Sequence, residues 1–145
     1  MTRLDEDNLR CGICLDYIKR MIGLPYLWGG DDTIAGFDCS GLVVEYLQCS
    51  GQLKENEDLK AHGLMRRYFD KRVILPETGC LVFFGKNDHA THVGICLNND
   101  LMIEAGGGGS KTQTKKDAVN QNAFIRVRPI NNRSDFLCFV DPFKI

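Results

Sequence analysis

Apolar residues recur at helical spacing in the first half of the chain and form strand-like runs in the second half. Over residues 6–22 they recur every three or four positions, which predicts an amphipathic helix that ends at Gly23. A second helix is predicted over 39–49, closed by Gly51, and a third, short one over about 59–69. The first half therefore reads as helices joined by loops.

The second half favours strands over helices. The predicted strands are short apolar or alternating runs bounded by glycine or polar residues: 79–85, 92–97, 101–105, 123–130 and 136–140. The sequence "NND" at 98–100 separates the second run from the third, which indicates a hairpin. Residues 106–122 are glycine-rich and then polar, so we expect a mobile loop there.

This order of elements predicts an α+β fold, with N-terminal helices packed on an antiparallel sheet. The chain has 145 residues, 43% of them hydrophobic and 26% charged, which are ordinary values for a globular protein. At this length, residues 1–145 are predicted to form a single domain with a real hydrophobic core.

Charge and hydropathy exclude several classes of partner. The formal net charge is −1 and the basic residues are scattered, so no nucleic-acid partner is expected. No apolar run approaches 18 residues, so no membrane partner is expected either. The amino terminus "MTRLDEDNLR" lacks the apolar core of a signal peptide. Work outside the cytoplasm would then need a delivery route other than Sec export.

Seven cysteines, an odd number, favour reduced thiols over a disulfide framework. The pair Cys11 and Cys14 forms a C-x-x-C motif, but no second ligand pair accompanies it, so no metal site is expected. The apolar residues around this pair recur at helical spacing: Leu9, Ile13, Tyr17, Ile18, Met21 and Ile22. We therefore interpret the two cysteines as small residues on a packed helix face.

Cys39 differs from the other cysteines in its position. It lies in the first turn of a predicted helix, where unpaired N–H groups and the helix dipole favour a thiolate. Asp38 can cap that helix, and Ser40 and Gly41 are small enough to let a substrate approach the sulfur. Cys39 is the candidate nucleophile, with a buried structural thiol as the alternative.

A thiolate nucleophile needs a base, and three histidines compete for that role. His62 lies in a polar segment without an evident partner, which favours a surface position, whereas His92 begins a predicted strand. If three residues form the hairpin loop, Leu97 pairs with Leu101, and Glu104 lies diagonally beside His92 on the same face. Glu104 is then the candidate orienting group, unless it is an ordinary surface carboxylate.

Four stretches together resemble the NlpC/P60 family of cysteine peptidases: "LPYLWGG", "FDCSGLV", "GCLVFF" and "HVGICL". The resemblance implies a papain-like α+β fold with Cys39 as nucleophile and His92 as base. It implies that Tyr26, with the Cys39 backbone N–H, binds the oxyanion, and that Asp38 and Ser40 contact substrate. Tyr26 could instead be a structural aromatic residue.

The resemblance also implies a substrate and a setting. Family members cut peptidoglycan stem peptides, typically between D-γ-glutamate and a diamino acid, without a cofactor or metal. With no export signal, the sequence predicts a phage-type wall hydrolase or an injected effector, with a virion or secretion system as a further partner. The alternatives are another thiol amidase or acyltransferase, and a non-catalytic module that binds peptide or assembles a phage tail.

The chain departs from the family pattern at several positions. Many members have histidine where this chain has Glu104, and a carboxylate there would raise the pKa of His92 and move the pH optimum. Cys80 stands where an aspartate is common, which we interpret as a structural change. The segment 106–121 could border the substrate cleft, and His89 is a candidate residue of its rim.

Overall fold

The computed structural model describes residues 3–144. Its sheet has six antiparallel strands in the order β3-β8-β4-β5-β6-β7. The strands are β3 (Arg72–Val73), β4 (Leu81–Lys86), β5 (His89–Cys96), β6 (Leu101–Gly106), β7 (Phe124–Pro129) and β8 (Phe136–Val140). The helices are α1 (Arg3–Lys19), α2 (Cys39–Cys49), α3 (Ala61–Arg67) and α4 (Lys115–Gln121). The predicted α+β class with an antiparallel sheet is confirmed.

The shorter elements connect these. A two-stranded hairpin, β1 (Asp31–Asp32) with β2 (Gly36–Phe37), precedes α2. Two 3₁₀ turns, η1 (Phe69–Lys71) and η2 (Ile130–Asn132), follow α3 and β7. None of the described helices is long and apolar enough to span a bilayer.

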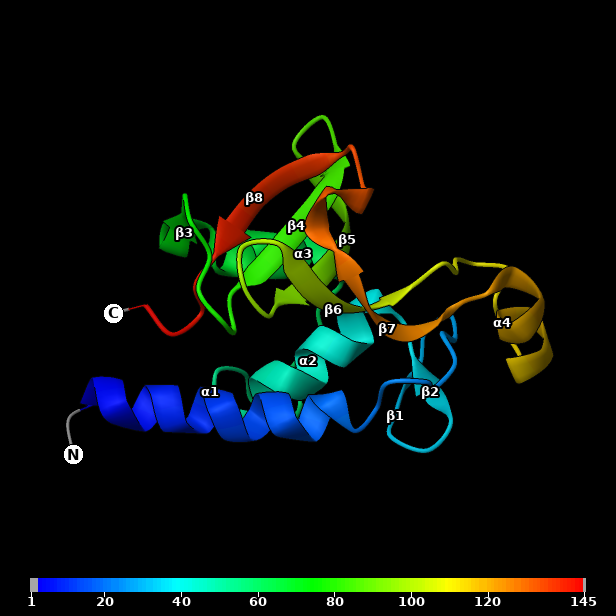
Figure 1. Cartoon of the computed structure of the whole chain (residues 1–145), viewed down its shortest axis with the longest axis horizontal. Coiled ribbons are helices and arrows are strands. Elements are labelled where there is room, and N and C mark those ends of the chain that lie inside the picture. The colour runs from blue at the N-terminus through cyan, green and yellow to red at the C-terminus, as the bar shows by residue number, and fades with distance from the viewer. Residues whose placement is uncertain (1–2, 145) are drawn as a thin grey trace.

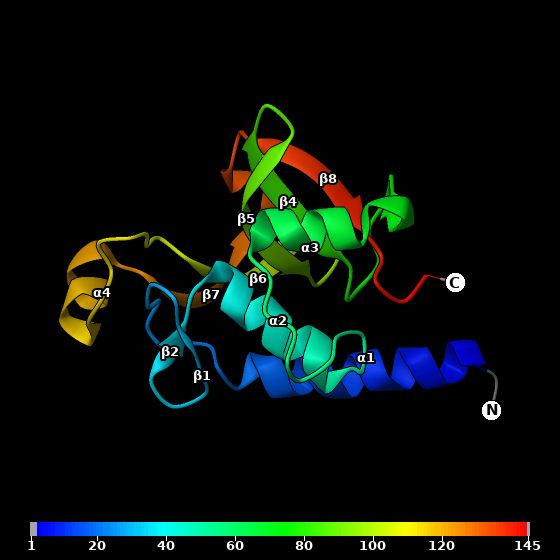
Figure 2. The same cartoon turned by 180° about the vertical axis from the view of Figure 1, so that it is seen from behind.

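Helices α1 and α2 lie together on one side of the molecule, with the sheet beyond them (Figure 1). Seen from behind, α3 crosses in front of β4 and β5, and α4 stands apart beside the β1-β2 hairpin (Figure 2). The alternating strand residues face two cores. The larger core joins the helices to Phe83, Val93 and Ile95. The smaller one, around Val82 and Phe84, covers the other face. Helix α2 is thus held between α1 and the sheet.

Helix α2 has the predicted bounds because the sequence supplies both of its ends. The Asp38 side chain accepts a hydrogen bond from the Gly41 backbone N–H at 2.7 Å and so caps the first turn. The apolar side chains of α2, among them Leu42, Val43 and Tyr46, are fully buried. This cap fixes where the first residue of the helix, Cys39, enters the fold.

The β5-β6 hairpin has the register predicted from a three-residue loop. The Leu97 backbone N–H donates to the Leu101 carbonyl at 2.8 Å, and Ile95 pairs with Ile103. The paired ladder of these strands consists of Ile95 with Ile103 and Cys96 with Met102. His92 and Glu104 lie outside these two pairs, and their relative position follows from the same register. A shift of the register by one residue would have moved Glu104 to the opposite face of the sheet.

The predicted bounds of the first helix, 6–22, were wrong at its C-terminal end. Helix α1 ends at Lys19, three residues earlier, and residues 20–22 form a turn. Two of the apolar residues in the predicted pattern, Leu9 and Ile13, are 54% and 60% exposed. The cysteines of the C-x-x-C motif are buried, with Leu15 and Ile18. Their interpretation as packed helix residues is confirmed.

The prediction that residues 106–122 form a loop without regular structure was wrong. This segment contains α4, which begins with a capping box in which the Thr114 and Asp117 side chains each accept from the other's backbone N–H. Before the helix, the buried Thr112 hydroxyl donates to the Gln121 side chain and accepts from the Gly109 N–H. These bonds give the segment a defined path past the β1-β2 hairpin.

Candidate active site

Cys39 is half-buried at the first residue of α2, and the loop before it is tied to the same cap. The second oxygen of Asp38 accepts from the Gly29 backbone N–H at 3.1 Å, and Lys60 lies 3.6 Å from it. Asp38 is only 6% exposed, so its carboxylate interacts with groups of the protein and hardly with solvent. The unpaired N–H groups at the start of α2 remain beside the sulfur, where they stabilise negative charge.

His92 joins Cys39 and Glu104. Its Nε2 lies 2.9 Å from Oε1 of Glu104, and its ring is close enough to the Cys39 side chain for the two groups to influence each other's charge. Burial lowers the pKa of His92, but the interactions with Cys39 and Glu104 outweigh burial and raise the pKa to about 9. The ring therefore keeps its second proton at neutral pH. The predicted contact of His92 with Glu104 is present.

Glu104 is 2% exposed and remains ionised because three cations surround it. Burial raises its pKa, but His92, Arg128 and Arg126 together bring the pKa below its ordinary value. Arg126 Nε and Arg128 Nη1 lie 3.8 and 4.0 Å from Oε2 of Glu104. These distances are too long for hydrogen bonds, and Arg126 Nε is a buried nitrogen without a hydrogen-bond partner. The two arginines thus act on Glu104 through charge.

Gly106 leaves room for this carboxylate. A Cβ atom at position 106 would overlap Oε2 of Glu104, so the absence of a side chain lets the Glu104 carboxylate fold back over the strand. The sequence did not reveal this role, because the glycine lies at the start of a longer glycine run.

Tyr26 lies close enough to Cys39 and Asp38 to be affected by their charges. Its pKa is raised, first by burial and then by the charges of those two residues, so the phenol keeps its proton. Its ring packs against Gly108, where a Cβ atom would collide with it. The segment predicted to border the cleft therefore lies against the tyrosine, and a protonated phenol near the sulfur is suited to donate to an oxyanion.

The sequence profile of the NlpC/P60 family matches residues 23–129. The chain belongs to the NlpC/P60 family. The matched region spans the four motifs and includes Tyr26, Cys39, His92 and Glu104.

Two relatives of this chain are named endopeptidases. The chain is 36% identical over 90 residues to the bifunctional muramidase/DL-endopeptidase CwlT of Bacillus subtilis, covering 60% of this chain and 26% of CwlT. It is 28% identical over 109 residues to the murein DD-endopeptidase MepH of Escherichia coli, covering 70% and 38%. The chain thus spans about a quarter to two fifths of the length of these relatives.

Solved structures share the NlpC/P60 fold. The peptidoglycan hydrolase RipB of Mycobacterium tuberculosis superposes with a TM-score of 0.70 at 21% identity, covering 97% of this chain and 68% of that one. The NlpC/p60 domain of the peptidoglycan hydrolase SagA gives 0.65 at 20% identity, covering 90% and 97%. This similarity establishes the fold of the present NlpC/P60 chain.

The two residues that follow Cys39 face the protein interior. The Ser40 side chain is buried, and its hydroxyl donates to Asp38 at 3.4 Å. A Cβ atom at Gly41 would overlap the Gly30 carbonyl. The absence of a side chain at Gly41 therefore lets the loop before α2 pack against the helix start and, contrary to expectation, does not open a path for substrate.

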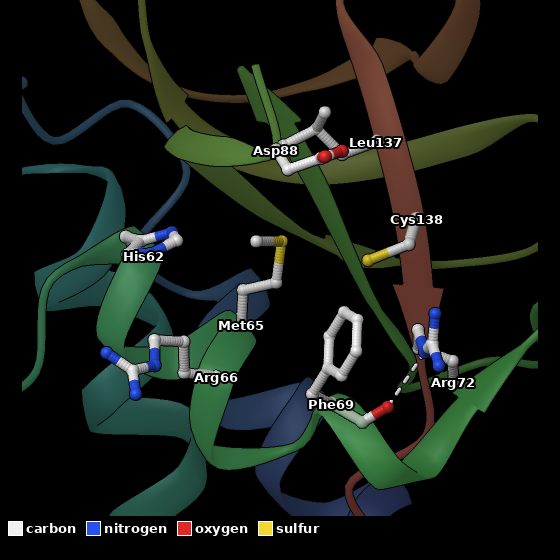
Figure 3. A pocket seen from close by; sticks show the side chains of 8 residues that line it. All are labelled: His62, Met65, Arg66, Phe69, Arg72, Asp88, Leu137 and Cys138. Atoms are coloured by element: carbon white, nitrogen blue, oxygen red, sulfur yellow. Dashed lines mark hydrogen bonds between the residues drawn. The ribbon is translucent and has the colours of Figure 1, made fainter. Parts of the chain in front are cut away.

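His62 was wrongly predicted to lack a partner. Its Nδ1 accepts from the Ala90 backbone N–H at 3.2 Å, and its ring stacks on His89 at 4.1 Å between centroids. His89 is exposed, which fits both a residue at the cleft rim and an ordinary surface residue. His62 also lines a cavity of about 660 Å³, into which Met65, Phe69 and Cys138 point (Figure 3). Cys39, His92 and Glu104 do not line this cavity.

Within residues 3–144, no three or more His, Cys, Asp or Glu side chains group closely enough to hold a metal ion.

Replacing Glu104 with glutamine should move the alkaline limb of the pH profile. With Glu104 present, the His92 pKa of about 9 keeps the imidazolium up to that pH, so activity falls as pH rises through about 9. Glutamine preserves the shape but removes the charge, which lowers the pKa of His92. We expect the limb to move to lower pH and kcat/KM to fall about 10²-fold. An unmoved limb would contradict the role of Glu104.

Replacing Arg126 with glutamine should move the same limb in the opposite direction. Loss of a positive charge near Glu104 favours the imidazolium, so the limb should rise by about half a pH unit. Glutamine can still donate to the Asn122 carbonyl, which Arg126 does at 2.8 Å. Arg128→Gln is the parallel variant and should move the limb in the same direction, because Arg128 Nη1 lies 4.0 Å from the same Glu104 oxygen. A downward shift in Arg126→Gln would contradict this account.

Proposed function

We propose that this chain is a cysteine peptidase that hydrolyses an amide bond in peptidoglycan stem peptides. The observation that carries the proposal is the grouping of Cys39, the first residue of a capped helix, with His92, which is hydrogen-bonded to Glu104. A half-buried thiol beside a protonated imidazole has the geometry of an activated nucleophile. The endopeptidase names of relatives such as CwlT and MepH support peptidoglycan as the substrate.

The reaction begins with a thiolate and imidazolium pair formed by Cys39 and His92. The sulfur attacks the amide carbonyl carbon, and negative charge develops on the carbonyl oxygen. The Tyr26 hydroxyl and the Cys39 backbone N–H donate to this oxygen. His92 then gives its proton to the departing amine, and the C–N bond breaks to leave a thioester on Cys39.

Hydrolysis of the thioester regenerates the enzyme. His92, now neutral, accepts a proton from a water molecule that attacks the thioester carbonyl. The sulfur leaves as a thiolate, and the imidazolium forms again beside it. Glu104 stays ionised throughout and holds the ring by Nε2, so that Nδ1 faces the sulfur and the leaving group.

We place the cleaved bond between D-γ-glutamate and the diamino acid. The support for this choice is the 36% identity to CwlT, whose name specifies a DL-endopeptidase, against 28% to the DD-endopeptidase MepH. The delivery route, by a virion or a secretion system, stays a prediction.

Mass spectrometry of purified muropeptides tests the bond. Stem peptides of tripeptide and tetrapeptide length, and a cross-linked dimer, are incubated with the reduced protein. We expect a fragment that ends in D-glutamate from both monomers. Conversion of the dimer to intact tetrapeptides alone would contradict the assigned bond, and no cleavage of any substrate by folded, reduced protein would contradict the peptidase assignment.

A further inference from the structure

Two thiols outside the active site lie against each other. The Cys49 thiol donates to the Cys14 sulfur at an Sγ–Sγ distance of 2.8 Å. Cys14 is a buried residue of α1, and Cys49 is the exposed last residue of α2. The two are 35 positions apart in the chain, so the contact joins the N-terminal helix to the helix that begins with Cys39.

We propose that Cys14 and Cys49 are a cross-linking site, at which an oxidant forms a disulfide between α1 and α2. A disulfide has an S–S distance of about 2.05 Å, so the sulfurs need to approach by less than about 1 Å. The inference does not depend on the proposed function.

The other cysteine of the C-x-x-C motif faces a different environment. The Cys11 sulfur contacts the Tyr46 hydroxyl at 3.4 Å and the Thr78 carbonyl at 3.7 Å. Cys11 thus contacts Tyr46 and Thr78, whereas Cys14 is the cysteine that lies against Cys49. The motif visible in the sequence is therefore not the pair that the fold brings together.

The cross-link leaves the candidate nucleophile free. Cys39 and Cys49 stand at opposite ends of α2, ten residues apart, which corresponds to about 15 Å along the helix axis. A disulfide at the far end would fix the position of α2 against α1 without using the Cys39 sulfur. Oxidised protein should therefore keep a reactive thiol.

Oxidised glutathione can supply the oxidising equivalents. The Cys49 thiolate attacks one sulfur of oxidised glutathione, which gives a mixed disulfide and releases one glutathione. The Cys14 thiolate then attacks the Cys49 sulfur and releases the second glutathione. In sum, two protein thiols and one oxidised glutathione give one protein disulfide and two reduced glutathiones, so two electrons pass to the reagent.

The second step should limit the rate. Burial is the first cause that raises the pKa of the Cys14 thiol, and it persists in the mixed disulfide, so little Cys14 thiolate is present at neutral pH. The intramolecular step should accelerate about tenfold for each pH unit between about 7 and 9.

Peptide mapping of Cys39→Ala protein tests the cross-link, because trypsin separates the two cysteines. Cleavage at Arg10, Lys19, Arg20 and Lys54 gives the peptides 11–19 and 21–54. With Cys39 replaced, Cys49 is the one cysteine of the longer peptide. Folded protein is equilibrated with glutathione mixtures near pH 8.5, where the slow step proceeds, and the remaining thiols are alkylated after an acid quench.

We expect a joined peptide, two hydrogens lighter than the sum of the parts, in which fragmentation between Gly12 and Ile13 places the link on Cys14. The matched variant Cys39→Ala with Cys49→Ser should give no joined peptide. Oxidation should raise the Tm by about 10 °C in the first protein and leave the second unchanged. Peptides that stay separate, or a link through Cys11, would overturn the proposal.

Discussion

Replacing Cys39 with alanine should lower kcat/KM for stem-peptide cleavage by at least about 10⁴-fold. The variant lacks the sulfur that forms the thioester, and no other thiol can replace it from the start of α2. The fold should persist, because the side chain is half-buried and the Asp38 cap bonds to Gly41, not to Cys39. Initial rates with a purified muropeptide and circular dichroism of both proteins measure the two quantities.

Cys138→Ala is the matched control for this loss. Cys138 is also a half-buried thiol, but it lines the separate cavity of Figure 3 and not the His92 site. Its replacement should change kcat/KM less than about twofold. Activity of Cys39→Ala within tenfold of the unchanged protein would rule out Cys39 as the nucleophile.

Replacing His92 with asparagine should lower kcat by about 10³-fold, because both proton transfers lose their carrier. Asparagine can still accept or donate one hydrogen bond, but it takes no positive charge. The thiolate then loses its counter-ion, so alkylation of Cys39 by iodoacetamide should also slow. The alkylation rate is read by mass spectrometry and needs no substrate.

His89→Asn provides the control for the second prediction. His89 is exposed and stacks on His62, three positions before His92 in the same strand. Its replacement should leave alkylation of Cys39 unchanged and reduce kcat only slightly. Equal effects of the two substitutions would mean that histidine at 92 does not act as the base.

The sequence predicted the start of α2 and the register of the β5-β6 hairpin well, because their signals are local. Asp38 before an apolar helical run determines where α2 begins, and the loop at 98–100 determines the register that brings Glu104 to the side of His92. Helix α4 was also within reach, because Thr114 and Asp117 have the spacing of a capping box. The glycines before this helix, Gly106 to Gly109, favoured the prediction of a loop instead.

Contacts between distant segments could not be predicted in this way. The alternation in β7 places Arg126 and Arg128 on one face, but only the pairing of β7 with β6 brings them to Glu104. The contact of Cys14 with Cys49 depends likewise on how α1 and α2 pack. Which apolar residues of α1 are buried depends on the same packing, since Leu9 and Ile13 follow the helical pattern but are exposed.

Digestion of muropeptides in the presence of hydroxylamine tests the central claim, a thioester on Cys39, most directly. Hydroxylamine competes with water for a thioester, so the N-terminal fragment should appear by mass spectrometry partly as a hydroxamate. The hydroxamate share should rise with hydroxylamine concentration, and Cys39→Ala should give neither product. Release of the free acid alone at every hydroxylamine concentration, with cleavage retained in Cys39→Ala, would contradict the account.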